Sequence, residues 1–167
     1  MNKELQEKLY EKYPKLFGQK DLPMTQTAMC WGIDTGDGWY NIMDSLCLCI
    51  NAHIKNLEHQ KKYRSGVETL EAESLEAESL EDDISGVEFV QVKEKFGRLR
   101  VYTTYSDDTI EGMVDMASVL SGRTCENCGN PGEIARYSGW YRPLCPKCAE
   151  DHVKKSGHKI DAPDEDE

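Results

Sequence analysis

The hydrophobic and polar positions of this chain change period several times along its length. Residues 2–13 carry an apolar side chain at every fourth position, which is typical of a short helix. Residues 38–63 carry one at every third or fourth position, and this spacing predicts a long amphipathic helix. Asp37 stands just before that helix, where a carboxylate can cap the first turn and suits the helix dipole. The apolar stripe of the long helix consists of Trp39, Ile42, Met43, Leu46, Ile50, Ile54 and Leu57.

An alternating pattern replaces the helical one after residue 86. Residues 87–92 and 98–104 predict two strands joined by a short connection, and residues 107–121 return to helical spacing. Alternation gives the strand pair an apolar face and a polar face. The apolar face consists of Val90, Val92, Leu99 and Val101, and the polar face of Gln91, Lys93, Arg98, Arg100 and Tyr102. We therefore expect an α+β fold in which the long helix packs on a small antiparallel sheet.

Two C-x2-C pairs follow the last of these helices. Cys125 and Cys128 form the first pair, and Cys145 and Cys148 form the second, with 16 residues between the pairs. Two thiolates three residues apart can bind one tetrahedral Zn2+, and four of them leave no position for a catalytic water. Strand-like segments and a Ser138–Gly139 turn lie between the pairs. The sequence therefore predicts a C-terminal zinc ribbon with one structural zinc ion.

Negative charge is concentrated in two segments. Residues 65–86 contain eight acids and no lysine or arginine, and residues 161–167 contain five more acids. We interpret residues 65–86 as an acidic low-complexity linker or insertion, and residues 151–167 as an acidic disordered tail. Residues 1–64 are then the N-terminal helical part of the core. Residues 87–122 form a hairpin and helix that complete the core, and residues 123–150 form the zinc ribbon.

Composition narrows the classes of protein that the chain can belong to. Its longest apolar run, Leu46 to Ile50, has five residues, and no apolar stretch follows the N-terminus. We therefore expect a cytoplasmic protein without a membrane partner. In that compartment, the seven cysteines favour metal binding over disulfide bonds. The net charge of -11 disfavours broad contact with nucleic acid. The sequence leaves homo-oligomerisation open.

Basic and aromatic side chains suggest a site for a small anion. An arginine can grip a phosphate with two hydrogen bonds while an aromatic ring stacks on a base. The candidates are Lys93, Arg98, Arg100 and Tyr102 on the strand pair, with Trp140 and Arg142 in the ribbon. The alternatives are a solvated sheet face, arginines paired with acids of this chain, and aromatic residues that cover the ribbon core.

Weaker patterns have simple structural explanations. Cys49 and His53 are four residues apart and could pair as nucleophile and base, or as half a metal site. The sequence indicates no third group, so we favour a partly buried cysteine beside a boundary histidine. Residues 34–38 resemble an acidic turn and lack the spacing of a calcium loop. His152 and His158 are expected to be solvated residues of the tail.

Three stretches together resemble a family of small proteins encoded by bacteriophages and prophages. They are Gly36-Asp37-Gly38-Trp39, residues 92–100, and the cysteine module with Gly129 to Gly132 and Gly139-Trp140. The resemblance covers residues 28–64 and 87–150, and this chain departs from the pattern in its acidic insertion. Small phage proteins commonly bind and block something in the host, so the resemblance implies a host protein as partner.

These observations support three functional hypotheses. The first is a non-enzymatic zinc-binding protein that blocks a host defence factor or sequesters an anionic, nucleotide-like signal. The second is an accessory protein that binds nucleic acid through the zinc ribbon. The third, which we rank last, is a small enzyme that uses Cys49 and His53, or the aspartates near Gly36.

Overall fold

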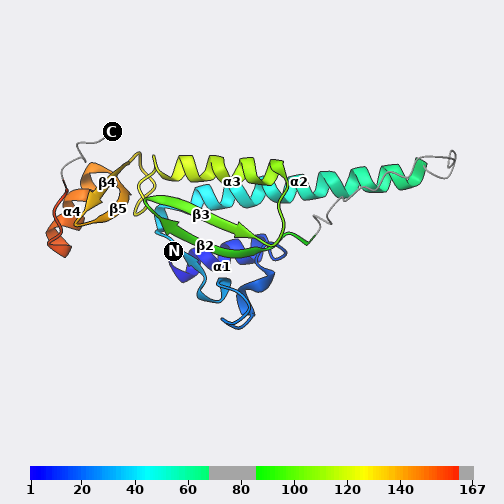
Figure 1. Cartoon of the computed structure of the whole chain (residues 1–167), viewed down its shortest axis with the longest axis horizontal. Helices are drawn as coiled ribbons and strands as arrows, with labels where there is room; N and C mark the ends of the chain where they lie inside the picture. Colours follow the sequence, from blue (N-terminus) through cyan, green and yellow to red (C-terminus); the bar gives the residue numbers. More distant parts are fainter. Residues whose placement is uncertain (68–85, 162–167) are drawn as a thin grey trace.

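The computed structural model describes residues 1–67 and 86–161, and it confirms the α+β architecture (Figure 1). Most of the predicted acidic linker and the end of the predicted tail, residues 68–85 and 162–167, lie outside the described residues. The helices are α1 (Lys3–Lys12), α2 (Tyr40–Val67), α3 (Asp108–Ser121) and α4 (Pro146–Ser156), with short 3-10 helices η1 (Gly18–Asp21), η2 (Met29–Trp31) and η3 (Asp37–Trp39). The strands are β1 (Ile33–Asp34), β2 (Phe89–Lys95), β3 (Arg98–Thr103), β4 (Glu133–Tyr137) and β5 (Trp140–Leu144).

The larger sheet has the order β1-β2-β3. Strands β2 and β3 are antiparallel, with Val92 opposite Val101 and Lys93 opposite Arg100, so the predicted apolar and polar faces are confirmed for these residues. Strand β2 continues through Lys95, and only Phe96 and Gly97 form the turn. Both turn residues have positive φ, as the two-residue hairpin turn that matches strand twist requires. The short parallel strand β1 was not predicted, because two residues give no periodic signal.

The hydrophobic core lies between α1, α2, α3 and the three-stranded sheet. Trp39, Met43 and Ile50 of the predicted stripe are completely buried, together with Leu9 of α1 and Phe89 of β2. Each such side chain contributes roughly 1.5–3 kcal/mol when it leaves water. In Figure 1, α2 and α3 run along one side of the sheet, and α1 lies toward the other. The apolar stripe of α2 therefore joins the N-terminal segment to the sheet.

The prediction that Asp37 caps the long helix is wrong. Its carboxylate accepts hydrogen bonds from the backbone N and the side-chain Nδ2 of Asn2, at 2.7 and 2.8 Å. Residues 37–39 form the 3-10 helix η3 that leads into α2, and Gly36 occupies the N-cap position without a side-chain hydrogen bond. Asp37 thus ties the start of α1 to the start of α2. The donor from Asn2 is too far along the chain for a local pattern to indicate it.

Helix α3 runs antiparallel to α2 and covers the outer edge of β3 (Figure 1). The backbone N of Leu99 donates to the Ser121 hydroxyl at 2.8 Å, so a backbone donor at the free edge of β3 finds its acceptor on a helix side chain. At the other end of α3, His53 of α2 meets Asp107. Helix α2 has 28 residues, about 42 Å at 1.5 Å per residue, and extends well beyond α3.

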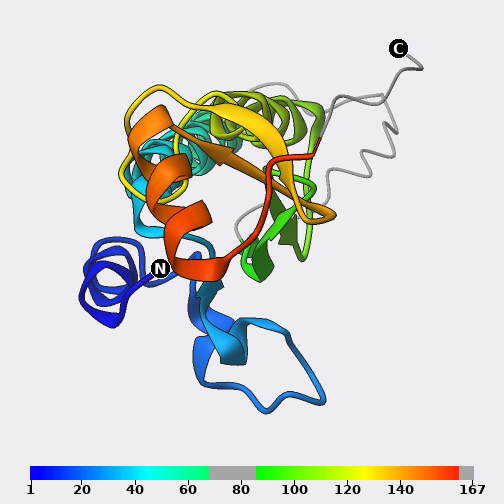
Figure 2. The ribbon, with the colours of Figure 1, turned by 90° about the vertical axis from the view of Figure 1, so that its left-hand side faces the viewer.

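The C-terminal module, residues 123–161, forms one end of the molecule (Figure 2). Strands β4 and β5 pair around the predicted Ser138–Gly139 turn, and α4 follows directly. The prediction of a disordered tail from residue 151 is wrong for residues 151–161. Helix α4 continues to Ser156, and Ile160 then forms a bridge with Tyr137. We call this unit, including its return segment 157–161, the metal module.

Candidate metal centre

The four cysteines singled out by their spacing converge on one point. The sulfur atoms of Cys125, Cys128, Cys145 and Cys148 all lie within 4.8 Å of one another, and those of Cys128 and Cys145 are 3.7 Å apart. Four sulfurs placed tetrahedrally about 2.3 Å from a zinc ion are separated by about 3.8 Å. No disulfide joins any of the seven cysteines of the chain. The geometry of the sulfur atoms therefore suits a tetrahedral metal ion.

Local backbone structure places each pair of thiols. Gly129, at φ 78°, lets the chain turn back after Cys128, and its backbone N donates to the Cys125 carbonyl at 2.9 Å. Cys145 is the N-cap of α4, with Pro146 in the first helical position. The backbone N of Cys148 donates to the Cys145 sulfur, and this bond, together with the neighbouring thiols, lowers the pKa of Cys145 to about 7. The start of α4 thus favours a thiolate at Cys145.

The thiols of Cys128 and Cys148 resist ionisation, because the pKa of each is raised. Burial raises the pKa of the Cys148 thiol, and the neighbouring Cys145 and Cys128 raise it further. The pKa of Cys128 is also raised; a hydrogen bond from the Asn130 backbone lowers it, but burial and the adjacent thiols outweigh that bond. Several thiolates this close together repel one another, and a divalent cation removes the repulsion. The donor set therefore fits a soft divalent metal.

Two glycines from the other half of the chain hold the first cysteine pair against the core. A Cβ on Gly38 would lie less than 3 Å from the Cys125 carbonyl and from the backbone N of Cys128, and one on Gly36 would meet the Glu126 carbonyl. Both glycines are needed for this close approach, since any side chain would push the cysteine turn away. The backbone N of Gly38 also donates to the Glu126 carbonyl at 2.8 Å.

Glu126, between the first two cysteines, connects three parts of the molecule. Its side chain is 7% exposed, and its carboxylate accepts hydrogen bonds from the backbone N of Gly36 at 3.0 Å and from Arg142 of β5 at 3.1 Å. The indole of Trp39 donates to the Thr124 carbonyl at 2.9 Å. Our sequence interpretation missed the close contact of Gly36 and Gly38 with residues 125–129, which we call the glycine seat, and assigned residues 34–38 to a turn. The available signal was the pair of glycines beside a tryptophan, Gly36-Asp37-Gly38-Trp39.

The structure divides the predicted anion-binding residues between two places. On the strand pair, Arg100 donates to the Ser118 hydroxyl at 2.6 Å, and the Arg98 guanidinium lies close to Gly122. The Lys93 ammonium is 5.9 Å from the centre of the Tyr102 ring. Arg100 is therefore turned toward α3, where Ser118 accepts its hydrogen bond, and Arg98 is turned toward the residue that follows α3.

Trp140 and Arg142 lie instead at a cleft of about 510 Å3 between the core and the metal module. Three carboxylates line this cleft, those of Asp34, Glu94 and Glu126, and Arg142 is already paired with Glu126. Burial raises the pKa of Glu94, and the nearby Glu126 and Asp34 raise it further. The prevailing charge of the cleft does not favour an anion.

The two histidines expected in the tail are packed instead of solvated. His152 of α4 contacts the Tyr137 ring edge-on, with ring centres 5.2 Å apart, and His158 contacts His152 edge-on at 5.3 Å. Burial lowers the pKa of His152. His152 thus packs α4, which holds Cys148, against Tyr137 of β4, and His158 packs on His152. The prediction that they are solvated is therefore wrong.

The structure brings Asp107 to His53, a third group that the sequence did not indicate. The Nε2 of His53 donates to the Asp107 carboxylate at 2.6 Å. The other oxygen of Asp107 accepts from the backbone N of Ile110 and caps α3. Within the described residues no hydrogen bond joins Cys49 to His53. The arrangement thus fastens the start of α3 to α2.

Comparison of the chain with protein-family models, curated proteins and solved structures found no match. Among residues 1–67 and 86–161, no helix is long and apolar enough to cross a membrane.

Proposed function

We propose that the chain is a non-enzymatic zinc-binding protein that acts by binding another protein. One zinc ion, held by Cys125, Cys128, Cys145 and Cys148, serves a structural role. The observation that carries the proposal is the closed set of four sulfur donors, with Cys128 and Cys145 3.7 Å apart, seated on the core through Gly36 and Gly38. A fourth thiolate occupies the position that a catalytic zinc keeps open for water.

Zinc is the metal that this donor set fits best. Four thiolates in a tetrahedral arrangement are typical of structural zinc sites and of simple iron sites, and zinc adds no redox chemistry. Binding of the ion also stabilises the module, because the cysteine pairs come from two segments that only the fold brings together. The ion would hold the hairpin β4–β5 and helix α4 in a fixed orientation on the core.

A protein partner is better supported than a small anion. Arg100 and Arg142 already form hydrogen bonds within the chain, with Ser118 and Glu126. The cleft beside Trp140 carries more negative than positive groups. Net acidity likewise opposes broad contact with nucleic acid. The resemblance to phage-encoded proteins makes a host protein the class of partner that we propose.

Native mass spectrometry of the full chain, recovered from the cells that produce it, tests this function. We expect one zinc ion per chain and a complex with a second protein. A Cys145→Ser variant should lose the metal, whereas Cys30→Ser, which changes a cysteine outside the cluster, should keep it. Recovery of a bound nucleotide or nucleic acid, with no protein partner, would overturn the proposal.

A further inference from the structure

The cleft between the core and the metal module takes its lining from both units. The core contributes the carboxylates of Asp34 and Glu94, and the module contributes Trp140 and Tyr141 of β5. The cleft encloses about 510 Å3, which lies within the range of about 300–1,000 Å3 that is usual for ligand sites. It therefore combines acidic and aromatic groups in one cavity of suitable size.

The negative charge of the cleft is only partly balanced. Arg142 is the one arginine or lysine among its lining residues, and it is paired with Glu126 at 3.1 Å. Within the part of the chain that the structure describes, the Asp34 carboxylate has no hydrogen bond or ion pair. The carboxylate of Glu94 accepts only from the backbone N of Gly97. Two lining carboxylates are thus left without a cation.

Other cations near these carboxylates have different contacts. The Met1 ammonium donates to two backbone carbonyls in and just after β1. The ammonium groups of Lys93 and Lys95 in β2 lie 5.9 and 5.4 Å from the centres of aromatic rings. Among residues 1–67 and 86–161, none of the three forms an ion pair with Asp34 or Glu94. A cation from outside the chain can therefore be accommodated.

The aromatic residues at the cleft are exposed in the folded chain. Trp140 is 71% exposed, so its indole does not cover the core of the metal module, whereas the buried Tyr137 does. Tyr141 is 37% exposed, and its ring lies edge-on to that of Phe96, with ring centres 6.4 Å apart. Phe96 stands in the turn between β2 and β3 and is 64% exposed. Two hairpins thus present aromatic rings beside carboxylates that have no cation.

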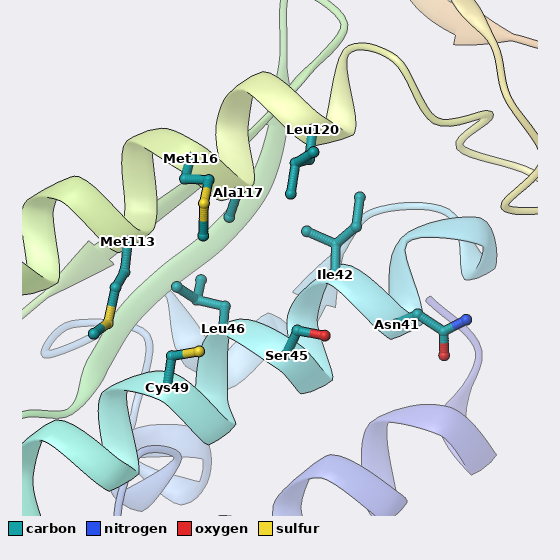
Figure 3. Close-up of a pocket in the computed structure, with 9 residues that line it drawn as sticks. All are labelled: Asn41, Ile42, Ser45, Leu46, Cys49, Met113, Met116, Ala117 and Leu120. Atoms are coloured by element: carbon teal, nitrogen blue, oxygen red, sulfur yellow. The ribbon is translucent and has the colours of Figure 1, made fainter.

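The groove between α2 and α3 is a hollow of a different kind (Figure 3). Ile42 and Leu46 of α2 point across it toward Met116 and Leu120 of α3. It encloses about 240 Å3, and the nine residues that line it are all uncharged. Nothing in this groove selects a cation, so it provides a control surface for binding experiments.

The groups in the cleft suit an organic cation. Calcium and magnesium ions take about six to eight oxygen ligands, and an indole adds nothing to such a shell. A guanidinium donates paired hydrogen bonds to a carboxylate and also stacks on aromatic rings, whereas an ammonium is a compact, strongly hydrated charge. Tryptophan is the aromatic residue that attracts a cation most strongly. The cleft therefore favours arginine over lysine.

The exposed rings also indicate that a protein carries the cation. Phe96 does not line the cleft but packs against Tyr141, so the aromatic surface continues outside the cavity. Apolar side chains next to an arginine in a peptide chain can cover that surface. A free guanidinium compound cannot reach it.

We propose that the cleft binds an arginine side chain of the partner protein. Its guanidinium pairs with Asp34 and Glu94 and stacks on Trp140, while apolar neighbours of that arginine cover Tyr141 and Phe96. The proposal rests on the proposed function and specifies where the partner binds and which side chain it presents. It accounts for an unpaired carboxylate and an exposed indole in the same cleft.

Fluorescence anisotropy with labelled model peptides tests the proposal. Each peptide has a leucine on both sides of a central residue, which is arginine, lysine or citrulline, a side chain with the shape of arginine and no charge. We expect the full chain to bind the arginine peptide about tenfold or more tightly than the citrulline peptide, because a charge-assisted hydrogen bond is lost. The lysine peptide should bind more weakly than the arginine peptide, and agmatine, a free guanidinium compound, should compete only weakly.

Equal binding of the arginine and citrulline peptides would overturn the proposal, and so would tighter binding of the lysine peptide. Agmatine that binds as tightly as the arginine peptide would also overturn it, because the ligand would then be a small cation and not a protein segment.

Two variants locate the binding. Asp34→Asn should weaken binding of the arginine peptide about tenfold or more, and Trp140→Ala about threefold or more. The Asp34 side chain has no hydrogen bond among the described residues and the Trp140 indole is exposed, so both variants should fold.

Each variant has a matched control that should leave binding unchanged. Asp115→Asn removes the same charge from an exposed position on α3 that does not line the cleft, so non-specific attraction falls equally in both proteins. Trp31→Ala removes an indole that is 67% exposed and lies outside the cleft lining. Met116→Ala tests whether the leucines enter the α2–α3 groove instead. Unchanged binding in Asp34→Asn and Trp140→Ala, or an equal loss in their controls, would contradict the assignment.

The native complex separates this inference from the proposed function. If the chain captures a protein in cells and both Asp34→Asn and Trp140→Ala keep that complex, the cleft proposal fails and the function stands. If no protein is captured and the arginine peptide still binds through Asp34 and Trp140, the function fails and the cleft remains a guanidinium site.

Discussion

At the scale of single residues, Gly36 and Gly38 decide how closely the first cysteine pair approaches the core. Neither glycine has a positive φ, so conformational freedom does not explain them. What they lack is a Cβ, and that absence makes room for the backbone of residues 125–129. The metal centre therefore depends on residues almost ninety positions away in the sequence.

Gly38→Ala should weaken metal binding about tenfold or more without altering a ligand. The methyl group has to displace backbone atoms, which costs about 1–3 kcal/mol when a packed contact is overfilled. Competition with a chromophoric chelator measures the change. The matched control is Gly112→Ala, which meets open space in α3 and should raise helix stability by up to about 1 kcal/mol. Equal metal affinity in wild type and Gly38→Ala would contradict the role given to this seat.

The sequence predicted the cysteines but not their seat, and the reason is physical. Cys125, Cys128, Cys145 and Cys148 have a short-range spacing that metal chemistry requires. The contact between Gly38 and Cys125 joins distant segments and leaves no periodic signal. The same holds for Asp37, whose partner Asn2 is 35 positions away.

At the scale of helices and strands, the pair His53–Asp107 links α2 to the first turn of α3. Asp107 both binds His53 and caps α3, because one of its oxygens accepts from His53 and the other from the backbone N of Ile110. Burial alone would raise the pKa of Asp107, but the hydrogen bonds from His53 and Ile110 outweigh it and lower the pKa. The ionised carboxylate therefore stabilises the folded state.

Asp107→Asn should cost about 1 kcal/mol of stability at neutral pH. Asparagine also caps helices, so the change mainly removes the charge beside His53. Since the folded pKa is lowered, this contribution is present above the unfolded value of about 3.9 and is lost as pH falls through the folded pKa. Urea denaturation of both proteins, side by side from neutral to acidic pH, should show the difference shrinking below about pH 4. A difference that stays constant with pH would exclude the electrostatic explanation.

The return segment 157–161 belongs to the metal module. The Asp161 carboxylate accepts from Arg136 at 3.0 Å and from the backbone N of Gly139 at 2.8 Å, and the backbone N of Ser138 donates to Lys159. Truncation after Gly157 should therefore speed hydrogen exchange in the Ser138–Gly139 turn. Truncation after Asp161 is the control and should leave exchange unchanged. Equal exchange in the two truncated chains would show that the segment does not hold the hairpin.

Element prediction succeeded where apolar periodicity was long. The stripe of α2 and the alternation in β2 and β3 were predicted, because burial on one face imposes a period on the sequence. Helix α4 was missed because it begins between the two cysteines of the second pair, and the acidic composition after it suggested a tail. A proline after Cys145 was the available signal, since proline favours the first helical position.

At the scale of the whole molecule, the metal module is an integral part of the fold. Glu126, between the first two cysteines, binds both Gly36 of the core and Arg142 of β5. Trp39 connects the start of α2 to Thr124. Loss of the ion should therefore also loosen the packing of α2 on the core.

Zinc-edge X-ray absorption of the purified full chain tests the central claim most directly, because it identifies both the metal and its ligands. The account predicts four sulfur neighbours about 2.3 Å from zinc and no lighter neighbour in the coordination shell. A shell with nitrogen or oxygen, or a folded chain with no zinc signal, would contradict the assignment of a closed centre at Cys125, Cys128, Cys145 and Cys148.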